Sequence, residues 1–338
     1  MTQTTAHSAT DTAAHKMAFV TGATGFLGRH LCRQLVAANW QVTAMCRSIP
    51  ENALEGVNYV TADLLDPASL EAAVPAGVDA IFHTAADTNT WRKNNPRQIA
   101  TNVGGTHNLI NAAEAQGAKR WVHVSSITTY GVDHEGMIDL DDDSEQHGLD
   151  SWVNYVQTKS QAERLVKNHT QALNVVVVNP THIIGPDDQH NWIRLFKMMI
   201  NDALPTVPVG AGSFVDVRDV AAGCIQAAEQ GQVGANYILG GHNLNFDQFI
   251  DAVAKAFDLT VTKRRKPMGL IKLVAQLQSR FAYLTGKEPD LTPESLQIIS
   301  HEYRTDSPGA KQDLGYVITP LDQTLNDIKV NLTERGIL

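Results

Sequence analysis

Short apolar segments alternate with longer amphipathic segments through the first half of the chain. The short runs predict strands at residues 18–21, 42–46, 58–61, 80–83 and 121–124. Apolar positions at helical spacing predict helices at about residues 25–38, from residue 66, at 96–116 and at 152–168. Pro67 suits the first turn of its helix, and Gly117 is placed to end the third helix.

A run of four valines from Val175 to Val178 adds a further strand. Such a run has no polar face, so the strand is covered on both sides, as in a parallel sheet between two helix layers. The alternation then predicts a doubly wound parallel α/β fold. We expect a mobile tail at 1–15, a main domain at 16–180, and a smaller C-terminal α/β lobe at 181–338 with some segments returning to the sheet.

Composition narrows the class of protein. The 338 residues are 43% hydrophobic and 19% charged, which excludes a disordered or fibrous chain. A net charge of −9 argues against a general nucleic-acid or anionic-membrane binder. Three widely spaced cysteines, no apolar run of about 18–20 residues and no signal-peptide layout lead us to expect a cytoplasmic protein without an integral membrane segment.

A glycine-rich turn joins the first strand to the first helix. Gly22, Gly25 and Gly28 have the spacing G-x-x-G-x-x-G. Glycines there let the backbone approach a pyrophosphate, and the helix N-terminus offers free N–H groups. Although a packing turn is the alternative, the position at the first strand–helix junction favours a dinucleotide site in a Rossmann-type sheet.

The residues at the end of the second strand indicate whether such a cofactor carries a 2′-hydroxyl or a 2′-phosphate on its adenosine ribose. NAD sites usually place a carboxylate there, whereas this chain has Arg47 and Ser48. The Arg47 guanidinium can pair with a 2′-phosphate, which favours NADP(H), with NAD(H) still possible. An ordinary surface arginine is the alternative interpretation.

Tyr155 and Lys159 lie four residues apart and share one face of the predicted helix. A nearby ammonium is expected to lower the pKa of the phenol towards neutrality, as acid–base catalysis requires. Ser125 and Ser126 follow the fifth strand, where a hydroxyl can bind a carbonyl oxygen, unless both serines only cap the strand.

These motifs, in this order, resemble the extended short-chain dehydrogenase/reductase family of the NAD-dependent epimerase/dehydratase type. They lie at 21–28, 63–64, 83–86, 102–106, 124–126, 155–159, 180–186 and 214–220. The resemblance implies that Ser126 is the catalytic serine, Tyr155 the acid–base, and Lys159 its partner and a ribose ligand. It implies that Asp63 contacts adenine and that Asn102 supports the site. Together with the glycine turn and Arg47, argued above, this gives the expected cofactor contacts: Gly22, Thr24, Gly25, Phe26, Leu27, Gly28, Arg47, Asp63, Leu64, Thr84, Ala85, Ala86, Asn102, Tyr155, Lys159, Pro180 and Ile183.

Segments 284–289, 291–293 and 313–316 resemble the dihydroflavonol-reductase-like and 3β-hydroxysteroid-dehydrogenase-like branch, which handles apolar ketones, aldehydes and secondary alcohols. We therefore expect an NADP(H)-dependent reductase or dehydrogenase whose partner is a small-molecule carbonyl or alcohol, with residues 16–180 binding the cofactor and the lobe binding the substrate. The resemblance also implies a homodimer formed through helices 96–116 and 152–168.

Two other functions remain open. The first is a sugar-nucleotide epimerase or dehydratase with tightly bound NAD, although the usual Arg-Pro is replaced by Asn179-Pro180 and no arginine shortly precedes Phe214 to clamp a diphosphate. The second is a non-catalytic NADP(H)-sensing regulator, a type that often lacks the Tyr–Lys pair.

Residues 270–284 predict a broad apolar helix after the basic run 263–266. It is interpreted as lobe core preceded by a solvated charge run. The alternatives are a wall of an apolar substrate pocket and contact with a membrane surface.

Overall fold

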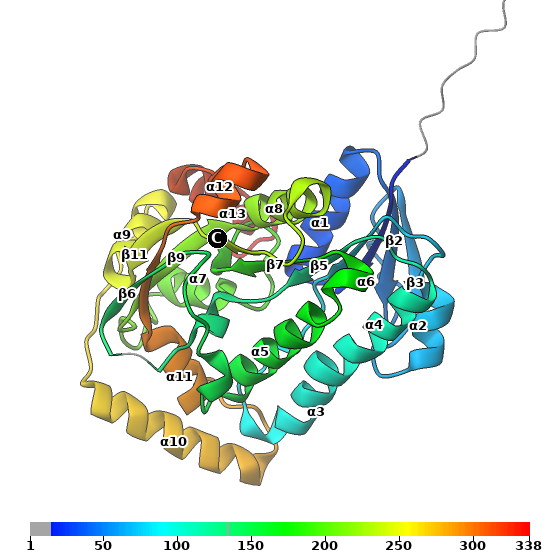
Figure 1. Cartoon of the computed structure of the whole chain (residues 1–338). Helices are drawn as coiled ribbons and strands as arrows, with labels where there is room; N and C mark the ends of the chain where they lie inside the picture. The colour runs from blue at the N-terminus through cyan, green and yellow to red at the C-terminus, as the bar shows by residue number, and fades with distance from the viewer. Residues whose placement is uncertain (1–14, 134) are drawn as a thin grey trace, which may run out of the picture.

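The computed structural model describes residues 15–133 and 135–338 (Figure 1). Apart from His15, the tail predicted over residues 1–15 therefore lies outside the described residues.

The main sheet of the described chain has seven parallel strands in the order β10-β7-β5-β4-β1-β2-β3. The strands are β1 (Met17–Thr21), β2 (Gln41–Cys46), β3 (Val57–Thr61), β4 (Ala80–His83), β5 (Trp121–Val124), β7 (Val175–Pro180) and β10 (Asn236–Leu239). The strand order reverses beside β1, which is the doubly wound arrangement. The predicted fold class is confirmed, and the five strands predicted in the first half each start within one residue of the expected position.

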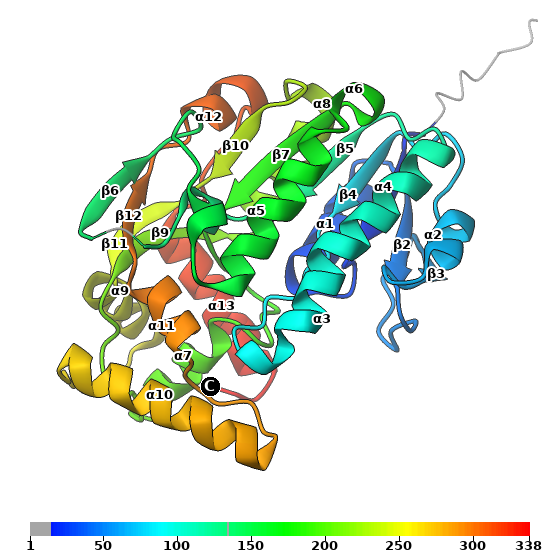
Figure 2. The same cartoon turned by 60° about the horizontal axis from the view of Figure 1, so that its bottom comes forward.

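Helices cover both faces of this sheet. One layer consists of α1 (Phe26–Ala37), α8 (Val217–Gln230) and α12 (Pro308–Leu314). The other consists of α2 (Pro67–Ala73), α4 (Gly105–Ala115), α5 (Asn154–Lys167) and α6 (Thr170–Leu173), with α4 and α5 side by side in Figure 2. Val176 and Val178 pack under the first layer, and Val175 and Val177 pack under the second. The valine run is therefore covered on both sides, as predicted.

The long helix expected at residues 96–116 is continuous but not regular. It comprises α3 (Asn95–Ile99), a wider π-helical turn (Ala100–Gly104) and α4. Such wide turns in α-helices frequently occur at functional sites. Asn102 lies in this turn and is buried, so the irregularity places a polar side chain inside the protein.

A second sheet lies beside the main one. It runs β11-β9-β12-β6, and β8 pairs with β9. The strands are β6 (Met137–Leu140), β8 (His182–Ile184), β9 (Ala211–Asp216), β11 (His242–Asn245) and β12 (Glu302–Thr305). Segments cross between the two parts, since β6 joins the second sheet while α8 and β10 return to the first.

The remaining helices belong to this second part. They are α7 (Ile193–Ile200), α9 (Phe246–Phe257), α10 (Met268–Thr285), α11 (Pro293–Ser300) and α13 (Leu321–Glu334). Helix α10 lies along the lower edge of the molecule in Figures 1 and 2. In the described chain, no helix has the length and apolar character needed to pass through a bilayer.

Candidate active site

A cavity of about 780 Å³ opens where several strands of the main sheet end. Gly22, Arg47, Thr84, Ser126 and Thr181 follow β1, β2, β4, β5 and β7 in turn, and all five line it. Open α/β sheets bind their ligands at this edge. The cavity therefore joins the glycine turn to the residues predicted for catalysis.

The glycine turn has no room for side chains. Gly22 has a φ of +67°, and a Cβ there would lie 2.7 Å from Thr84 Oγ1 and 2.8 Å from the amide nitrogen of Ala85. A Cβ on Gly28 would collide with the Gly22 carbonyl oxygen. Gly25 precedes α1 without a side-chain cap, so the first N–H groups of the helix remain for a ligand. This cradle fits a pyrophosphate held by main-chain groups.

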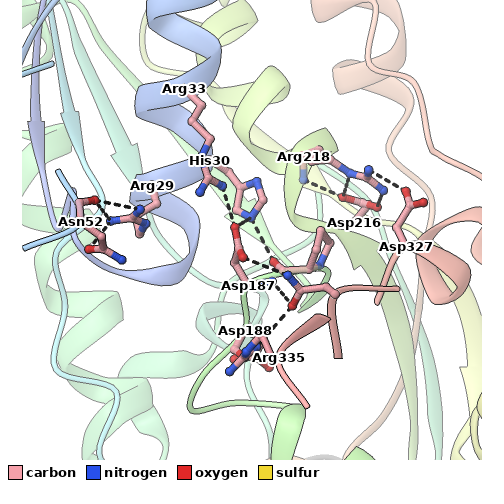
Figure 3. A network of polar contacts seen from close by, with 12 residues as sticks. Arg29, His30, Arg33, Asn52, Asp187, Asp188, Asp216, Arg218, Asp327 and Arg335 are labelled. Atoms are coloured by element: carbon pink, nitrogen blue, oxygen red, sulfur yellow. Dashed lines mark hydrogen bonds and ion pairs between the residues drawn. The ribbon is translucent and has the colours of Figure 1, made fainter. Parts of the chain in front are cut away.

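The segment that faces the glycine turn is fixed from two sides (Figure 3). From α1, Arg33 pairs with Asp187 at 2.7 Å, and His30 Nε2 lies 3.1 Å from the carbonyl oxygen of Pro186. From α13, the Asn331 Oδ1 atom accepts the main-chain N–H of Asp187 at 3.0 Å. Burial raises the pKa of Asp187, but the hydrogen bonds and charges of Arg33, Asn331 and His30 together lower it below its usual value. The wall of the cavity is thereby held in place relative to the turn.

Ser126 and Tyr155 meet in this cavity. Both side chains line it, and their hydroxyl groups are hydrogen-bonded. Ser126 Oγ also accepts hydrogen bonds from the Thr128 amide at 3.2 Å and the Thr128 hydroxyl at 3.0 Å, which orients it. A carbonyl oxygen between the two hydroxyls would find one donor from each.

Lys159 lies behind this pair rather than against the phenol. Its ammonium donates a 2.7 Å hydrogen bond to the carbonyl oxygen of Val124, at the end of β5. Burial raises the pKa of Tyr155, and the hydrogen bond with Ser126 lowers it only in part. The prediction that Lys159 lowers the pKa of Tyr155 is therefore wrong. The phenol is protonated at neutral pH, because burial outweighs the hydrogen bond with Ser126.

Burial lowers the pKa of Lys159 to about 8, while the negative charge of Glu163, one helical turn later, opposes this. The neighbouring imidazoles carry no charge at neutral pH, because burial and the lysine charge lower the pKa of His83 to about 3 and that of His123 well below its usual value. Glu163 thus supplies the negative charge next to this ammonium.

Glu163 is buried, with 1% of its side chain exposed, and its carboxylate is surrounded by donors. Gln146, Asn179 and Asn236 donate amide hydrogen bonds at 2.8, 3.0 and 2.6 Å, and the Ser125 hydroxyl donates another. These donors come from β7, β10 and the segments after β5 and β6. The carboxylate therefore links these segments beside Ser126 and Lys159.

Asn102, in the π-helical turn, is linked to the main chain of Tyr155 through Thr158. Its amide donates to the Thr158 hydroxyl at 3.1 Å, and Thr158 Oγ1 donates to the carbonyl oxygen of Tyr155 at 3.0 Å. Its other contacts are with the main chain of Asp87, at 2.7 and 3.0 Å. Asn102 does not itself line the cavity.

The structure brings twelve of the predicted site residues to the cavity wall and leaves six away from it. Those on the wall are Gly22, Thr24, Gly25, Phe26, Leu27, Gly28, Arg47, Thr84, Ala86, Ser126, Tyr155 and Ile183. Those not on it are Asp63, Leu64, Ala85, Asn102, Lys159 and Pro180. Asp63 is exposed and accepts the Leu65 amide at 2.9 Å, whereas Leu64 is core and packs against Gly105.

The far end of the cavity, away from the glycine turn, was not predicted from the sequence. Its wall there includes Val132, His182, Trp192, Ile298 and Tyr303, from loops, β8, α11 and β12. Burial lowers the pKa of His182 to about 4, so this imidazole is neutral. No local motif marks these residues, because segments more than 100 residues apart in the chain form one wall.

The family follows from a comparison of the chain with known proteins. Residues 18–240 match the model of the NAD dependent epimerase/dehydratase family. The chain belongs to this family. The predicted resemblance to the extended short-chain dehydrogenases/reductases is therefore confirmed.

Relatives extend the match to the C-terminal part. A putative dihydroflavonol 4-reductase of Synechocystis is 29% identical over 320 residues, covering 91% of this chain and 92% of the relative. A 2-alkyl-3-oxoalkanoate reductase of Stenotrophomonas maltophilia is 41% identical over 181 residues, about half of each chain. The crystal structure of gox2253 superposes with a TM-score of 0.81 at 26% identity, over 96% of this chain and 100% of that one.

Proposed function

We propose that this protein is an NADP(H)-dependent oxidoreductase that reduces a ketone or aldehyde of an apolar small molecule, or oxidises the corresponding alcohol. The observation that carries the proposal is the hydrogen-bonded pair Ser126–Tyr155 in the cavity that the glycine turn also lines. Relatives named as a putative dihydroflavonol 4-reductase and a 2-alkyl-3-oxoalkanoate reductase support the same direction of chemistry.

The chain's own groups fit a dinucleotide. The free N–H groups after Gly25 would hold the pyrophosphate, and Arg47 would hold a 2′-phosphate. We keep Asp63 as the proposed adenine contact, and Leu64, Ala85 and Pro180 as proposed contacts along the cofactor. When bound, the nicotinamide supplies or accepts the hydride.

Each protein group has a distinct task in carbonyl reduction. Tyr155, protonated at neutral pH, donates its proton to the carbonyl oxygen as negative charge develops there. The Ser126 hydroxyl donates a hydrogen bond to the same oxygen. Lys159 supplies positive charge from behind and fixes the end of β5, which carries Ser126.

The substrate end of the cavity suits an apolar molecule. Val132, Trp192, Ile298 and Ile299 line it. Among the described residues, the arginines on the wall are Arg29 and Arg47, beside the glycine turn, and no lysine lines it. A sugar diphosphate needs cationic partners, so this wall disfavours the epimerase alternative.

An NADPH-oxidation assay over apolar ketones, aldehydes and sterols tests the proposed function. We expect turnover of at least one class, with purified protein free of bound nicotinamide. Purified protein that retains NAD and consumes no added cofactor would instead support the epimerase or dehydratase. NADPH binding without turnover of any substrate would support the non-catalytic regulator.

Arg47→Ala tests the cofactor preference. We expect NADPH binding to weaken by at least about tenfold and NADH binding to change less than about twofold, because only NADPH carries the 2′-phosphate. Fluorescence titration with both cofactors measures the two constants, and NADH is the internal control. An equal loss for both would show that Arg47 does not contact the phosphate.

The pH dependence of reduction tests the role of Lys159. Its pKa of about 8 means that it is charged at neutral pH and loses its charge above pH 8. We expect kcat/KM to be level below about pH 8 and then to fall by up to tenfold per unit. Lys159→Arg, which stays charged, is expected to lower the rate but to remove the break. A wild-type profile that is flat from about pH 7 to 9 would contradict this role.

We further propose a cytoplasmic homodimer formed through the helical layer of α4 and α5. The free, buried thiols of Cys32, Cys46 and Cys224 suit a reducing compartment. Sedimentation velocity measures the oligomeric state, and a monomer at micromolar concentration would overturn the dimer.

A further inference from the structure

Helix α10 presents large apolar side chains to solvent. Six of them define what we call the outer face of α10: Leu270, Leu273, Val274, Leu277, Phe281 and Leu284. Their exposure ranges from 38% for Val274 to 84% for Leu284. The buried side of the same helix consists of Ile271, Ala275 and Ala282. Except for Ile271, the large aliphatic side chains of this helix therefore point away from the protein, and the lobe-core interpretation of this helix is wrong for its outer face.

The outer face is continuous. At about 100° per residue, its six positions fall within an arc of about 100°, and the three buried positions lie on another side of the helix. The helix stands along the edge of the molecule in both views (Figures 1 and 2). Contiguous apolar patches on a protein surface mark sites of interaction, unlike single exposed leucines.

The segment that carries this face has basic residues and no acidic ones, although Lys272 and Arg280 also line a cavity of about 1050 Å³ with Asp133, Glu135, Glu294 and Glu302. Residues 266–287 contain four cations, Lys266, Lys272, Arg280 and Lys287, and no aspartate or glutamate. All four are exposed, and none forms an ion pair with another described residue. The whole chain, in contrast, carries a net charge of −9. Lys266 and Lys287 at the two ends of the helix, and Arg280 beside the apolar arc, thus give this edge of an acidic molecule a local positive charge.

The basic run before the helix contributes little to this charge. Lys263 and Arg265 pair with Asp247, at 3.6 and 2.8 Å, and Arg264 pairs with Asp202 at 3.4 Å. The predicted solvated charge run is therefore largely paired within the protein. Of the run, Lys266 remains for an external partner.

We propose that the outer face of α10 docks on an anionic lipid surface, with the helix lying in the plane of the interface. Apolar side chains enter the boundary between headgroups and acyl chains, and flanking lysine and arginine side chains contact acidic headgroups. A long arginine or lysine side chain reaches the headgroups while its methylene groups stay apolar.

A second copy of this chain fits the face less well. Pairing of two α10 helices by a two-fold axis brings the same set of cations together, with no acidic residue on the helix to offset them. A lipid surface offers the complementary charge instead. The acidic remainder of the molecule is repelled by the same surface, so contact is limited to this edge.

Vesicle co-sedimentation of the full-length protein tests the proposal. We expect binding to phosphatidylcholine vesicles that contain phosphatidylglycerol, and at least about fivefold weaker binding to phosphatidylcholine alone. Raising the salt concentration is expected to reduce this difference by screening the lysine and arginine charges. Failure of the wild-type protein to bind either vesicle would overturn the proposal.

The double variant Leu273→Glu/Leu277→Glu removes apolar area and adds negative charge at the centre of the face. We expect at least about a tenfold loss of vesicle binding, with thermal unfolding and NADPH binding unchanged because these side chains are exposed. The matched control, Val317→Glu/Val330→Glu, makes the same charge change at exposed positions outside α10 and is expected to retain nearly all binding.

Equal vesicle binding by the two double variants would show that α10 is not the contact. Sedimentation velocity without lipid tests whether a second copy of this chain covers the face instead. If wild-type protein self-associates, and only the α10 variant is monomeric while neither binds vesicles, the face is an interface between copies and the lipid proposal is overturned.

Discussion

Replacing Tyr155 by Phe is expected to lower kcat for carbonyl reduction by about three orders of magnitude. The substitution removes the phenolic proton and the hydrogen bond with Ser126, and leaves the ring in place. NADPH affinity is expected to stay within about twofold, because the aromatic ring remains and the substitution leaves the glycine turn and Arg47, the proposed phosphate contacts, unchanged. Steady-state kinetics and a fluorescence titration measure the two quantities.

Two further variants show whether the effect belongs to this phenol. Tyr283→Phe removes an exposed hydroxyl on α10 and is expected to leave kcat unchanged. Ser126→Ala, which keeps the proton donor but removes one hydrogen bond to the oxygen, is expected to cost about a hundredfold. A Tyr155→Phe enzyme with near wild-type turnover would end the assignment of Tyr155 as the acid.

The parts of the site that could be predicted from the sequence are those formed by residues close together in the chain. The glycine turn needs glycine because Gly22 has a positive φ and Gly28 touches the carbonyl of Gly22, so the requirement is visible in a stretch of eight residues. The pair Tyr155–Lys159 is likewise set by one turn of α5. Spacing placed both residues on one face, but it did not show what the ammonium would contact.

The direction in which the pKa of Tyr155 shifts illustrates what residue spacing cannot predict. Proximity along the helix suggested that the lysine charge would lower it, yet the ammonium reaches the carbonyl of Val124 instead. Burial then dominates and raises the pKa. Both facts depend on how β5 and α5 pack, and sequence spacing carries no information about that.

Helix α10 shows a second limit. The spacing of its apolar residues correctly predicts a helix, but these residues lie on two sides of the helix. Ala275 and Ala282 allow close packing against the protein, while Leu277 and Phe281 face outwards. Because the large residue Ile271 is buried as well, neither size nor hydrophobicity alone decides which side packs inwards; the surface beneath the helix decides it.

Glu163→Gln is expected to destabilise the protein by about 3 kcal/mol. Four donors from separate segments converge on this carboxylate, and an amide turns two of its own N–H groups towards them. Urea unfolding measures the loss. Glu71→Gln, at an exposed position of α2, makes the same chemical change and is expected to stay within about 0.5 kcal/mol of wild type.

The same substitution separates a structural role from an effect on Lys159. Loss of the Glu163 charge removes the influence that opposes burial, so the pKa of Lys159 falls below about 8 and the break in the pH profile moves to lower pH. Lys159→Met is then expected to cost at least about 1 kcal/mol less stability in the Glu163→Gln background than in wild type, because the buried ammonium has already lost its counter-charge. If the two stability costs simply add and the pH break stays in place, Glu163 holds the strand ends together without acting on the lysine.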